Sequence, residues 1–353
     1  MAGMTGLETA AAGRPRRITI REVADLAGVS IATVSRVVNG RDDVAVETRE
    51  LVQRVIQQHG YTTNRTARSL SAGRTGLIGM LVPLVHPAYF SSILGGAAEA
   101  LYERDLRLLL SPTQHLHDRE VSLLERLAHG ATDGALIVLP EESSDELESL
   151  LDDGYRFVVV DPRERLHERV PAVSAANASG ADQAMRHLLG LGHRRIAAIT
   201  GPSTWVATLD RRTGYDAALA AAGILTDPEL VVEGDFEIPG GVAATERLLD
   251  LAEPPTAIFA FNDNLAIGAI EAARGRGLRV PEDLSVVGFD DVEHATVVSP
   301  QLTTVRQPLA EMGRMAVSML VRLLERQRFE MLHVQLGTRL VVRGSTAPPS
   351  GPS

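Results

Sequence analysis

The sequence of 353 residues contains no cysteine, and its 35 Lys+Arg residues are all arginine because no lysine occurs. The absence of cysteine excludes disulfides, thiolate metal sites and a cysteine nucleophile. No apolar run reaches the roughly 18–20 residues that a membrane-spanning helix needs. The N-terminal residues lack the apolar core of an export signal, which predicts a soluble, cytoplasmic protein. The length predicts two or three domains.

The charge is distributed unevenly along the chain. The net charge is −10, but residues 1–75 hold 11 arginines and 7 acidic residues, so this segment carries +4 and the remainder carries −14. A basic segment joined to an acidic body is typical of a protein that meets a polyanion at one end. A difference of this size also arises by chance, so the motifs must decide.

The N-terminal segment predicts a disordered arm over residues 1–17, followed by a three-helix domain over residues 18–61. Thr19 and Glu22 have the spacing of a capping box for the first helix. Gly28 permits a tight turn, and Ser30 can cap the second helix. The third helix starts after Ala45, which is a poor cap.

The second helix is expected over residues 31–39, and its valines face inward. Its outward side chains are Ile31, Ala32, Ser35 and Arg36. A helix, a glycine turn and a second helix with an outward, partly polar N-terminal half form the geometry of a DNA-reading helix-turn-helix. Residues 62–75 then predict a hinge helix and linker, too short to be helical alone in water and able to fold on binding.

Residues 18–39, ITIREVADLAGVSIATVSRVVN, closely resemble the head of LacI/GalR-family transcription regulators, and residues 64–71, NRTARSLS, resemble that family's hinge helix. The resemblance implies that the second helix enters the major groove and that paired hinge helices enter the minor groove. Arg36 would suit the O6/N7 edge of guanine, and Leu70 would be a wedge between base steps. The implied DNA-binding residues are Thr19, Ser30, Ile31, Ala32, Thr33, Ser35, Arg36, Asn39, Tyr61, Asn64, Ala67 and Leu70. The alternative is that Leu70 and Tyr61 pack locally and that Arg36 is solvated.

From residue 76 onward, apolar runs alternate with amphipathic segments, which predicts an α/β fold with parallel sheets. Strands are expected at residues 77–83, 106–111, 135–139 and 157–161, and in a second series at residues 196–200, 230–233, 256–261 and 285–289. The shared period predicts two lobes over residues 76–343 with a cleft between them. The chain is expected to cross between the lobes near residues 174–177, 303–307 and 328–333, and residues 344–353 are expected to form a disordered tail.

Loops at the strand ends carry aromatic and polar side chains, and ligands of such sheets bind outside the carboxyl ends of the strands. Carboxylates, an amide and a guanidinium beside aromatic faces suit a small polyhydroxylated ligand. The candidate effector-binding residues are Tyr89, Phe90, Asp161, Trp205, Arg211, Phe236, Asn262 and Asp290.

The core also resembles the LacI/GalR family, in residues 191–196, 211–215, 262–263, 281–291 and 300–305. The resemblance implies a periplasmic-binding-protein-like core in which Arg211, Asn262 and Asp290 hydrogen-bond the effector and Phe236 stacks on it. It also implies a homodimer that reads a pseudo-palindromic operator. One departure is Leu139-Pro140 after the third strand, which offers no obvious polar ligand.

Several residues admit a second interpretation. Arg211 and Asp290 could form a structural ion pair, and Trp205 could belong to the core. We expect Asp263 to cap the helix that follows it rather than to touch ligand. His115 and His117 superficially have metal-ligand spacing, but no third ligand is recognisable, so we expect a solvated helix start and no metal site.

These observations predict a ligand-controlled, sequence-specific transcription regulator, a repressor, whose effector is a sugar or sugar derivative. No apolar heptads follow residue 343, which predicts a dimer without a tetramerising coiled coil. A solute-binding protein of the same core fold is the first alternative. An enzyme is the second, although no nucleophile elbow, phosphate loop or metal constellation supports one, and no catalytic residue or cofactor is expected.

Overall fold

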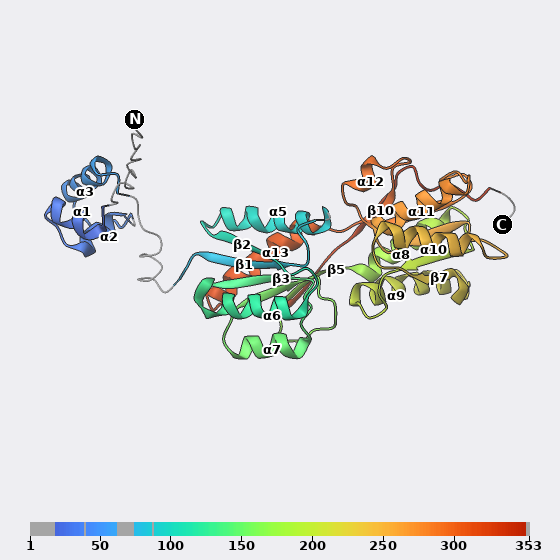
Figure 1. Ribbon diagram of the computed structural model, residues 1–353, viewed down its shortest axis with the longest axis horizontal. Helices are drawn as coiled ribbons and strands as arrows, with labels where there is room; N and C mark the ends of the chain where they lie inside the picture. Colours follow the sequence, from blue (N-terminus) through green and yellow to red (C-terminus); the bar gives the residue numbers. More distant parts are fainter. Residues whose placement is uncertain (1–17, 39, 62–73, 87, 351–353) are drawn as a thin grey trace, which may run out of the picture. The chain divides into compact units, whose positions relative to one another are not determined.

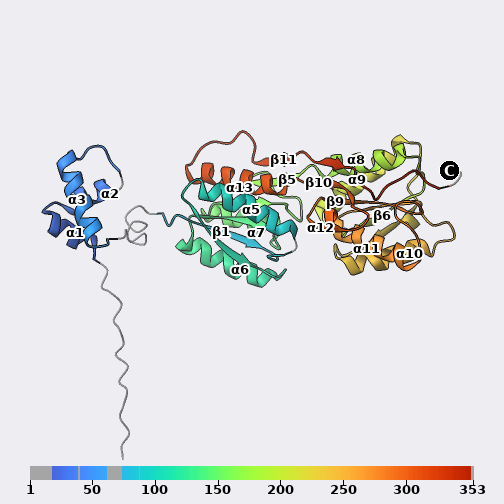
Figure 2. The ribbon, with the colours of Figure 1, turned by 90° about the horizontal axis from the view of Figure 1, so that it is seen from above.

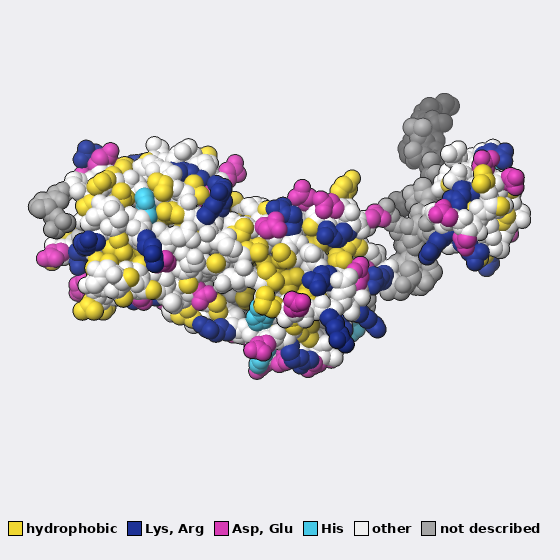
Figure 3. All heavy atoms as spheres, turned by 180° about the vertical axis from the view of Figure 1, so that it is seen from behind, with side chains coloured by type: hydrophobic (Ala, Val, Ile, Leu, Met, Phe, Trp, Pro, Cys, Tyr) yellow, Lys and Arg dark blue, Asp and Glu magenta, His cyan; other side chains and the backbone are white. Residues whose placement is uncertain are grey.

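The computed structural model describes residues 18–38, 40–61, 74–86 and 88–350, and the chain divides into two compact units between Thr75 and Gly76 (Figure 1). Within these residues, no helix is long and apolar enough to span a membrane. On the face shown in Figure 3, arginine and acidic side chains lie next to one another across the larger unit.

The first unit contains α1 (Ile20–Ala27), α2 (Ile31–Val38) and α3 (Val46–Gln58), whose apolar faces share one small core around Val23, Val34 and Val52. The predicted capping is confirmed. Thr19 and Glu22 form the capping box, and the Ser30 hydroxyl accepts a hydrogen bond from the backbone N–H of Thr33 at 3.1 Å. Ala45 makes no side-chain cap bond at the start of α3. The predicted arm over residues 1–17 and the hinge residues 62–73 lie outside the described residues.

Lobe 1 of the second unit is built on a parallel sheet with the strand order β11-β5-β4-β3-β1-β2. Its strands are β1 (Leu77–Val82), β2 (Arg107–Pro112), β3 (Gly134–Val138), β4 (Phe157–Val160), β5 (Ala172–Ala175) and β11 (His333–Leu336). Helices α5 (Ala88–Tyr102) and α13 (Leu309–Leu324) cover one face, and α6 (His117–Arg126), η1 (Leu127–Ala131) and α7 (Ser144–Asp152) cover the other (Figures 1 and 2). β1, β3 and β4 are almost entirely buried, which explains their continuous apolar sequences.

Lobe 2 repeats the plan with the strand order β12-β10-β9-β8-β6-β7, in which β12 alone is antiparallel to its neighbour. Its strands are β6 (Ile196–Thr200), β7 (Val231–Glu233), β8 (Ala257–Ala260), β9 (Ser285–Asp290), β10 (Thr303–Arg306) and β12 (Arg339–Val341). Helices α8 (Asn177–Gly190) and α9 (Val206–Ala221) cover one face, and α10 (Ile238–Leu249) and α11 (Asp263–Gly275) cover the other, with short η2 (Pro228–Leu230) and α12 (His294–Val297) beside them.

The chain passes between the lobes three times. The first passage, from β5 to α8, and the second, from β10 to α13, lie where the sequence placed them. The prediction for the third passage was wrong: β11 still belongs to the sheet of lobe 1, and the chain crosses at Gly337 and Thr338 before β12 joins lobe 2. The four strands next to these passages, β5, β10, β11 and β12, were not foreseen because each has only three or four residues.

The prediction of a disordered tail after residue 343 was wrong for residues 344–350, which pack on lobe 2. The Ser345 side chain is completely buried, donates to the carbonyl oxygen of Val286 at 2.6 Å and accepts from the backbone N–H of Thr303 at 2.8 Å. The carbonyl of Ala347 accepts from the His193 ring at 2.9 Å. The composition of this segment resembles that of a loop, but its buried polar groups need hydrogen-bond partners and find them in lobe 2.

Replacement of Ser345 by alanine should destabilise the second unit by about 1–3 kcal/mol, since it leaves a buried N–H and a buried carbonyl without their partner. Urea unfolding followed by the emission of the single tryptophan measures this, and Ser203→Ala, at an exposed position, is the control. Equal unfolding midpoints for the two variants would show that the tail does not contribute to the fold.

Candidate functional sites

The exposed face of α2 carries the side chains predicted to read bases. Val34 and Val37 are buried, whereas Ile31, Ala32 and Arg36 are exposed. The Arg36 side chain lies 3.6 Å from Asp43 and is 56% exposed, so it is only loosely held and can reach a partner in solution.

The other predicted DNA-binding residues of the described head lie at the starts of α1 and α2, within α2 and at the C-terminal end of the head. Thr19 and Ser30 use their hydroxyls as caps, and the hydroxyls of Ser30 and Thr33 lie 2.9 Å apart. Tyr61 packs against the core of the head, which agrees with the alternative that it packs locally, and it remains partly exposed. Ser35 is partly exposed on α2. Helix starts of this kind present backbone N–H groups to anions. Asn39, Asn64, Ala67 and Leu70 lie outside the described residues.

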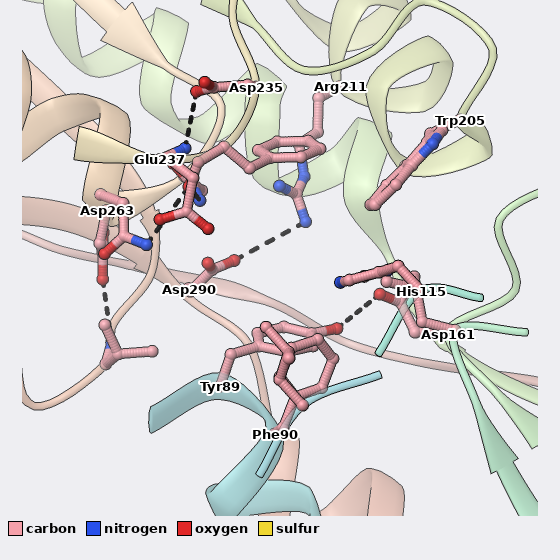
Figure 4. Close-up of a pocket in the computed structure, with 17 residues that line it drawn as sticks. Tyr89, Phe90, His115, Asp161, Trp205, Arg211, Asp235, Glu237, Asp263 and Asp290 are labelled. Atoms are coloured by element: carbon pink, nitrogen blue, oxygen red, sulfur yellow. Dashed lines mark hydrogen bonds and ion pairs between the residues drawn. The ribbon is translucent and has the colours of Figure 1, made fainter. Parts of the chain in front are cut away.

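In the second unit, a cavity with an empty volume of about 830 Å³, its open mouth included, lies between the lobes at the carboxyl ends of the central strands. All eight residues predicted to bind effector line it (Figure 4). Their contact with an effector stays a prediction. The lining also includes Leu84, His115, Leu139, Ala207, Asp235, Glu237, Asp263, Asn264 and Val292.

Arg211 is the buried cation of the cavity. Its Nε donates to the Asn177 side chain at 2.9 Å, and one terminal nitrogen donates to the carbonyl of Phe261. Its other terminal nitrogen lies 3.7 Å from Asp290, and the guanidinium carbon lies 3.9 Å from the centre of the Phe289 ring. The structural ion pair with Asp290 is therefore present, and it faces the cavity (Figure 4).

Two buried carboxyl groups, Asp161 of lobe 1 and Asp290 of lobe 2, face the same space as Arg211. Asp161 accepts a hydrogen bond from the Tyr89 hydroxyl at 2.5 Å, and Asp290 accepts one from the Gln307 amide at 2.7 Å. Burial raises the pKa of Asp161, and it raises the pKa of Asp290 to about 7 although Arg211 opposes the shift. Asp290 also has a φ of +117°, an unusual backbone conformation of the kind that clusters at binding sites.

The loops at the start of α11 differ from the sequence expectation. Asp263 does not cap the helix: its carboxyl accepts from the backbone N–H of Val292 at 2.9 Å and from the Thr304 hydroxyl at 2.5 Å. The cap is Asn262, whose oxygen accepts from the N–H of Leu265 at 2.8 Å while its amide donates to the carbonyl of Phe236 at 2.9 Å. Asn262 thus lines the cavity with both polar groups already engaged. Sequence spacing could not separate the two residues, because either side chain can reach the first turn.

Aromatic rings form two walls of the cavity. Trp205 and Phe236 lie 5.4 Å apart, and Tyr89 and Phe90 lie 5.3 Å apart in an edge-to-face arrangement. The Phe236 ring rests on the backbone of Gly201, where an added Cβ would lie 1.9 Å from its Cζ. Trp205 also packs against the apolar core of lobe 1, so both of its interpretations hold in part.

Sequence reasoning missed several lining residues for identifiable reasons. Asp235 and Glu237 flank Phe236 in one loop, so the loop itself was a sufficient signal. His115 was considered only as a metal ligand, yet its ring contacts Glu141 at 3.0 Å and lines the cavity. Among the described residues, no group of three or more His, Asp and Glu side chains could hold a metal ion.

A head of three helices with an exposed second helix, attached to two α/β lobes around a polar and aromatic cavity, defines the class of ligand-responsive DNA-binding regulators. A family profile described as "Bacterial regulatory proteins, lacI family" matches residues 19–64, and a "Periplasmic binding protein-like domain" matches residues 185–346.

The relatives agree with both profiles. The chain is 40% identical over 339 residues to the HTH-type transcriptional regulator CelR of Thermobifida fusca. The aligned region covers 94% of this chain and 99% of CelR. It is 32% identical over 330 residues to catabolite control protein A of Priestia megaterium, with 93% and 99% covered.

Solved structures extend the likeness to three dimensions. A CelR–cellobiose complex matches with a TM-score of 0.72 at 38% identity over 93% of this chain and all of that chain. A lac repressor dimer bound to operator and the anti-inducer ONPF matches with a TM-score of 0.83 at 28% identity over 94% of this chain and all of that chain.

The chain belongs to the LacI family of bacterial transcription regulators. It is an effector-controlled regulator that binds DNA through its head.

Replacement of Asp290 by asparagine should stabilise the effector-free protein at pH 8. The pKa of Asp290 is about 7 in the fold and near 4 in the unfolded chain, so the penalty on folding grows as the pH rises from about 4 to 7 and is complete above 7. The gain should be roughly 1–4 kcal/mol at pH 8 and should disappear as the pH falls from 7 toward 4. Urea unfolding midpoints of both proteins at pH 8 and pH 4.5 test this, and a variant that is less stable than wild type at pH 8 would contradict it.

Proposed function

We propose that the protein is a repressor that binds a pseudo-palindromic operator as a homodimer, and that a disaccharide of the cellobiose type is its effector. The arrangement in the cleft carries the proposal: the Asp161 and Asp290 carboxyls and the Arg211 guanidinium face one space between aromatic walls. Carboxylates and a guanidinium bind sugar hydroxyls by directed hydrogen bonds, and aromatic faces cover the apolar faces of sugar rings.

The relatives support the choice of ligand and partner. CelR, whose solved complex contains cellobiose, is 38% identical to this chain over nearly its whole length. The lac repressor of similar fold is a dimer on operator DNA. A DNA partner also supports a cytoplasmic location for this protein, and the relatives being regulators supports a role without catalysis.

Control follows from differential affinity. A sugar that binds better to one arrangement of the two lobes shifts the protein toward that arrangement. The free energy of DNA binding can change by no more than the difference between the sugar's binding free energies for the two arrangements. The proposal requires a binding site between the lobes, because a ligand that contacts one lobe alone binds equally well to both lobe arrangements and cannot favour either of them.

Replacement of Arg36 by alanine should weaken operator binding by about 10–100-fold, because a bidentate contact between arginine and guanine contributes about 1–3 kcal/mol. Gel-shift titration of an operator selected from random DNA with the wild-type protein measures the loss. Arg54→Ala is the matched control, since it removes the same charge from the exposed side of α3. Equal losses in the two variants would mean that Arg36 contributes only charge.

Affinity for cellobiose should rise as the pH rises through about 7. Sugar hydroxyls donate to a carboxylate, so binding favours the ionised form of Asp290, whose pKa in the free protein is about 7. Calorimetric titration between pH 6 and pH 8 tests this, with Asp290→Asn as the variant that loses the pH dependence. The Asp290→Ala change should reduce affinity by about 10–150-fold, the range for a hydrogen bond to a charged group. Unchanged affinity would place the sugar elsewhere.

The two alternatives to regulation give different results. A solute-binding protein would bind cellobiose but would select no operator from random DNA. An enzyme would convert the sugar, so recovery of intact cellobiose after prolonged incubation with the protein argues against it.

A further inference from the structure

Arg163, in the loop of lobe 1 that follows β4, contacts lobe 2 in two ways. Its carbonyl oxygen accepts a hydrogen bond from the backbone N–H of Val206 at 2.8 Å. Its guanidinium carbon lies 4.6 Å from the centre of the Trp205 ring, within the range of a cation–π interaction. Trp205 and Val206 are the N-cap and first residues of α9, the helix that carries Arg211. Both contacts therefore join lobe 1 to the start of one helix of lobe 2.

The hydrogen bond from Val206 to Arg163 gives the start of α9 an acceptor that the helix itself lacks. The first N–H groups of a helix have no partner within the helix, and a capping side chain usually accepts from one of them. Trp205 has no acceptor atom in its side chain and makes no side-chain cap bond. The carbonyl of Arg163 supplies an acceptor from the opposite lobe, so this contact is part of how α9 begins.

The guanidinium is held from the side of lobe 1. It pairs with Glu141, whose other carboxylate oxygen lies 3.0 Å from Nδ1 of His115. The backbone N–H of Glu141 donates to the buried carboxyl of Glu120 at 3.3 Å, which fixes the loop that carries it. The Arg163 and Glu141 side chains are only 27% and 12% exposed, so solvent competes weakly for the pair.

Trp205 lies between this pair and the cavity. The cavity lining includes Trp205 and His115 but not Arg163, so the guanidinium supports the indole from outside the ligand space. Phe236 approaches the same indole at 5.4 Å. Figure 4 shows Trp205 across the cavity from Asp263, with the Arg211–Asp290 pair between them. The cavity thus has Trp205 at one end and the charged Arg211–Asp290 pair in its middle.

We propose that Arg163 is a positioning residue of the effector cleft, which holds the Trp205 ring in place from the opposite lobe and so makes recognition of the second ring of a disaccharide depend on contact between the lobes. This inference rests on the proposed function, because it takes the cleft to be the sugar site. One sugar ring lies at Arg211 and Asp290, and the second lies against Trp205. A monosaccharide at the charged middle has little to gain from Arg163.

The test compares Arg163→Ala with Arg169→Ala by calorimetric titration with cellobiose and with glucose. Arg169 belongs to the same loop and also pairs with carboxylates, Glu148 and Asp152, but is 62% exposed. Arg163→Ala should weaken cellobiose binding about 3- to 30-fold, the range for a cation–π contact, and leave glucose binding within about two-fold. Arg163→Lys should restore the affinity only in part, since an ammonium cannot stack and pair as a planar guanidinium does. Arg169→Ala should bind both sugars like the wild-type protein.

A second readout does not depend on any ligand. Trp205 is the single tryptophan of the chain, so the emission spectrum of the free protein reports on this ring. Arg163→Ala should shift that spectrum and Arg169→Ala should leave it unchanged. All three substitutions keep the Arg163 or Arg169 backbone, so the hydrogen bond at the start of α9 remains.

The outcomes separate the two proposals. If the wild-type protein binds cellobiose and Arg163→Ala binds it equally well, the positioning role is wrong and the proposed function stands. Parallel losses for cellobiose and glucose would also overturn the role, because they would indicate a general loss of structure. If the wild-type protein binds neither sugar, the proposed effector is wrong. An emission spectrum of Arg163→Ala equal to that of the wild-type protein would overturn the positioning role of Arg163, whatever the effector is.

Discussion

The cleft between the lobes depends on one buried cation that lies beside two buried carboxyl groups. Arg211 is fixed by the Asn177 side chain, the Phe261 carbonyl and the Phe289 ring, and it lies beside Asp290. Asp161 reaches the same space from lobe 1. Burial raises the pKa of both carboxyl groups, which means that the fold holds them at a cost. Under the proposed function, a ligand that supplies hydrogen-bond donors would relieve this cost, so the same carboxyl groups would weaken the free protein and favour the complex.

The passages between the lobes place this charge where a change of lobe arrangement affects it. Gln307, at the second passage, donates to Asp290, and Asn177, at the end of the first, accepts from Arg211. The backbone segments that link the lobes are therefore bonded directly to the groups that are proposed to bind effector. A change in ligand contacts and a change in the hinge are then parts of one rearrangement, as differential binding requires.

Much of this arrangement could be predicted from the sequence. The capping box at Thr19, the alternation of buried strands and helices, and the set of eight cavity-lining residues all followed from local patterns and from family resemblance. Two of the failures share a physical cause, since each depends on partners distant in sequence. The Asp263 carboxyl accepts hydrogen bonds from Val292 and Thr304 instead of capping its own helix. The buried Ser345 side chain is hydrogen-bonded to Val286 and Thr303 of lobe 2. Two of the short strands beside the passages, β11 and β12, pair with strands that are distant in sequence, β5 and β10.

The departure noted after the third strand shows how a missing ligand can be replaced by a neighbour. Leu139-Pro140 offers no polar side chain to the cavity, but Glu141 directly after it anchors both His115 and Arg163. Glu141 acts through these partners, and Arg163 in turn carries its influence to Trp205 in the other lobe. A loop that lacks a hydrogen-bonding contact of its own can therefore still shape the cavity by fixing an aromatic surface. Under the proposed function, a change at Glu141 or Arg163 would alter the aromatic surface at Trp205 and leave the Arg211–Asp290 pair of the cleft in place.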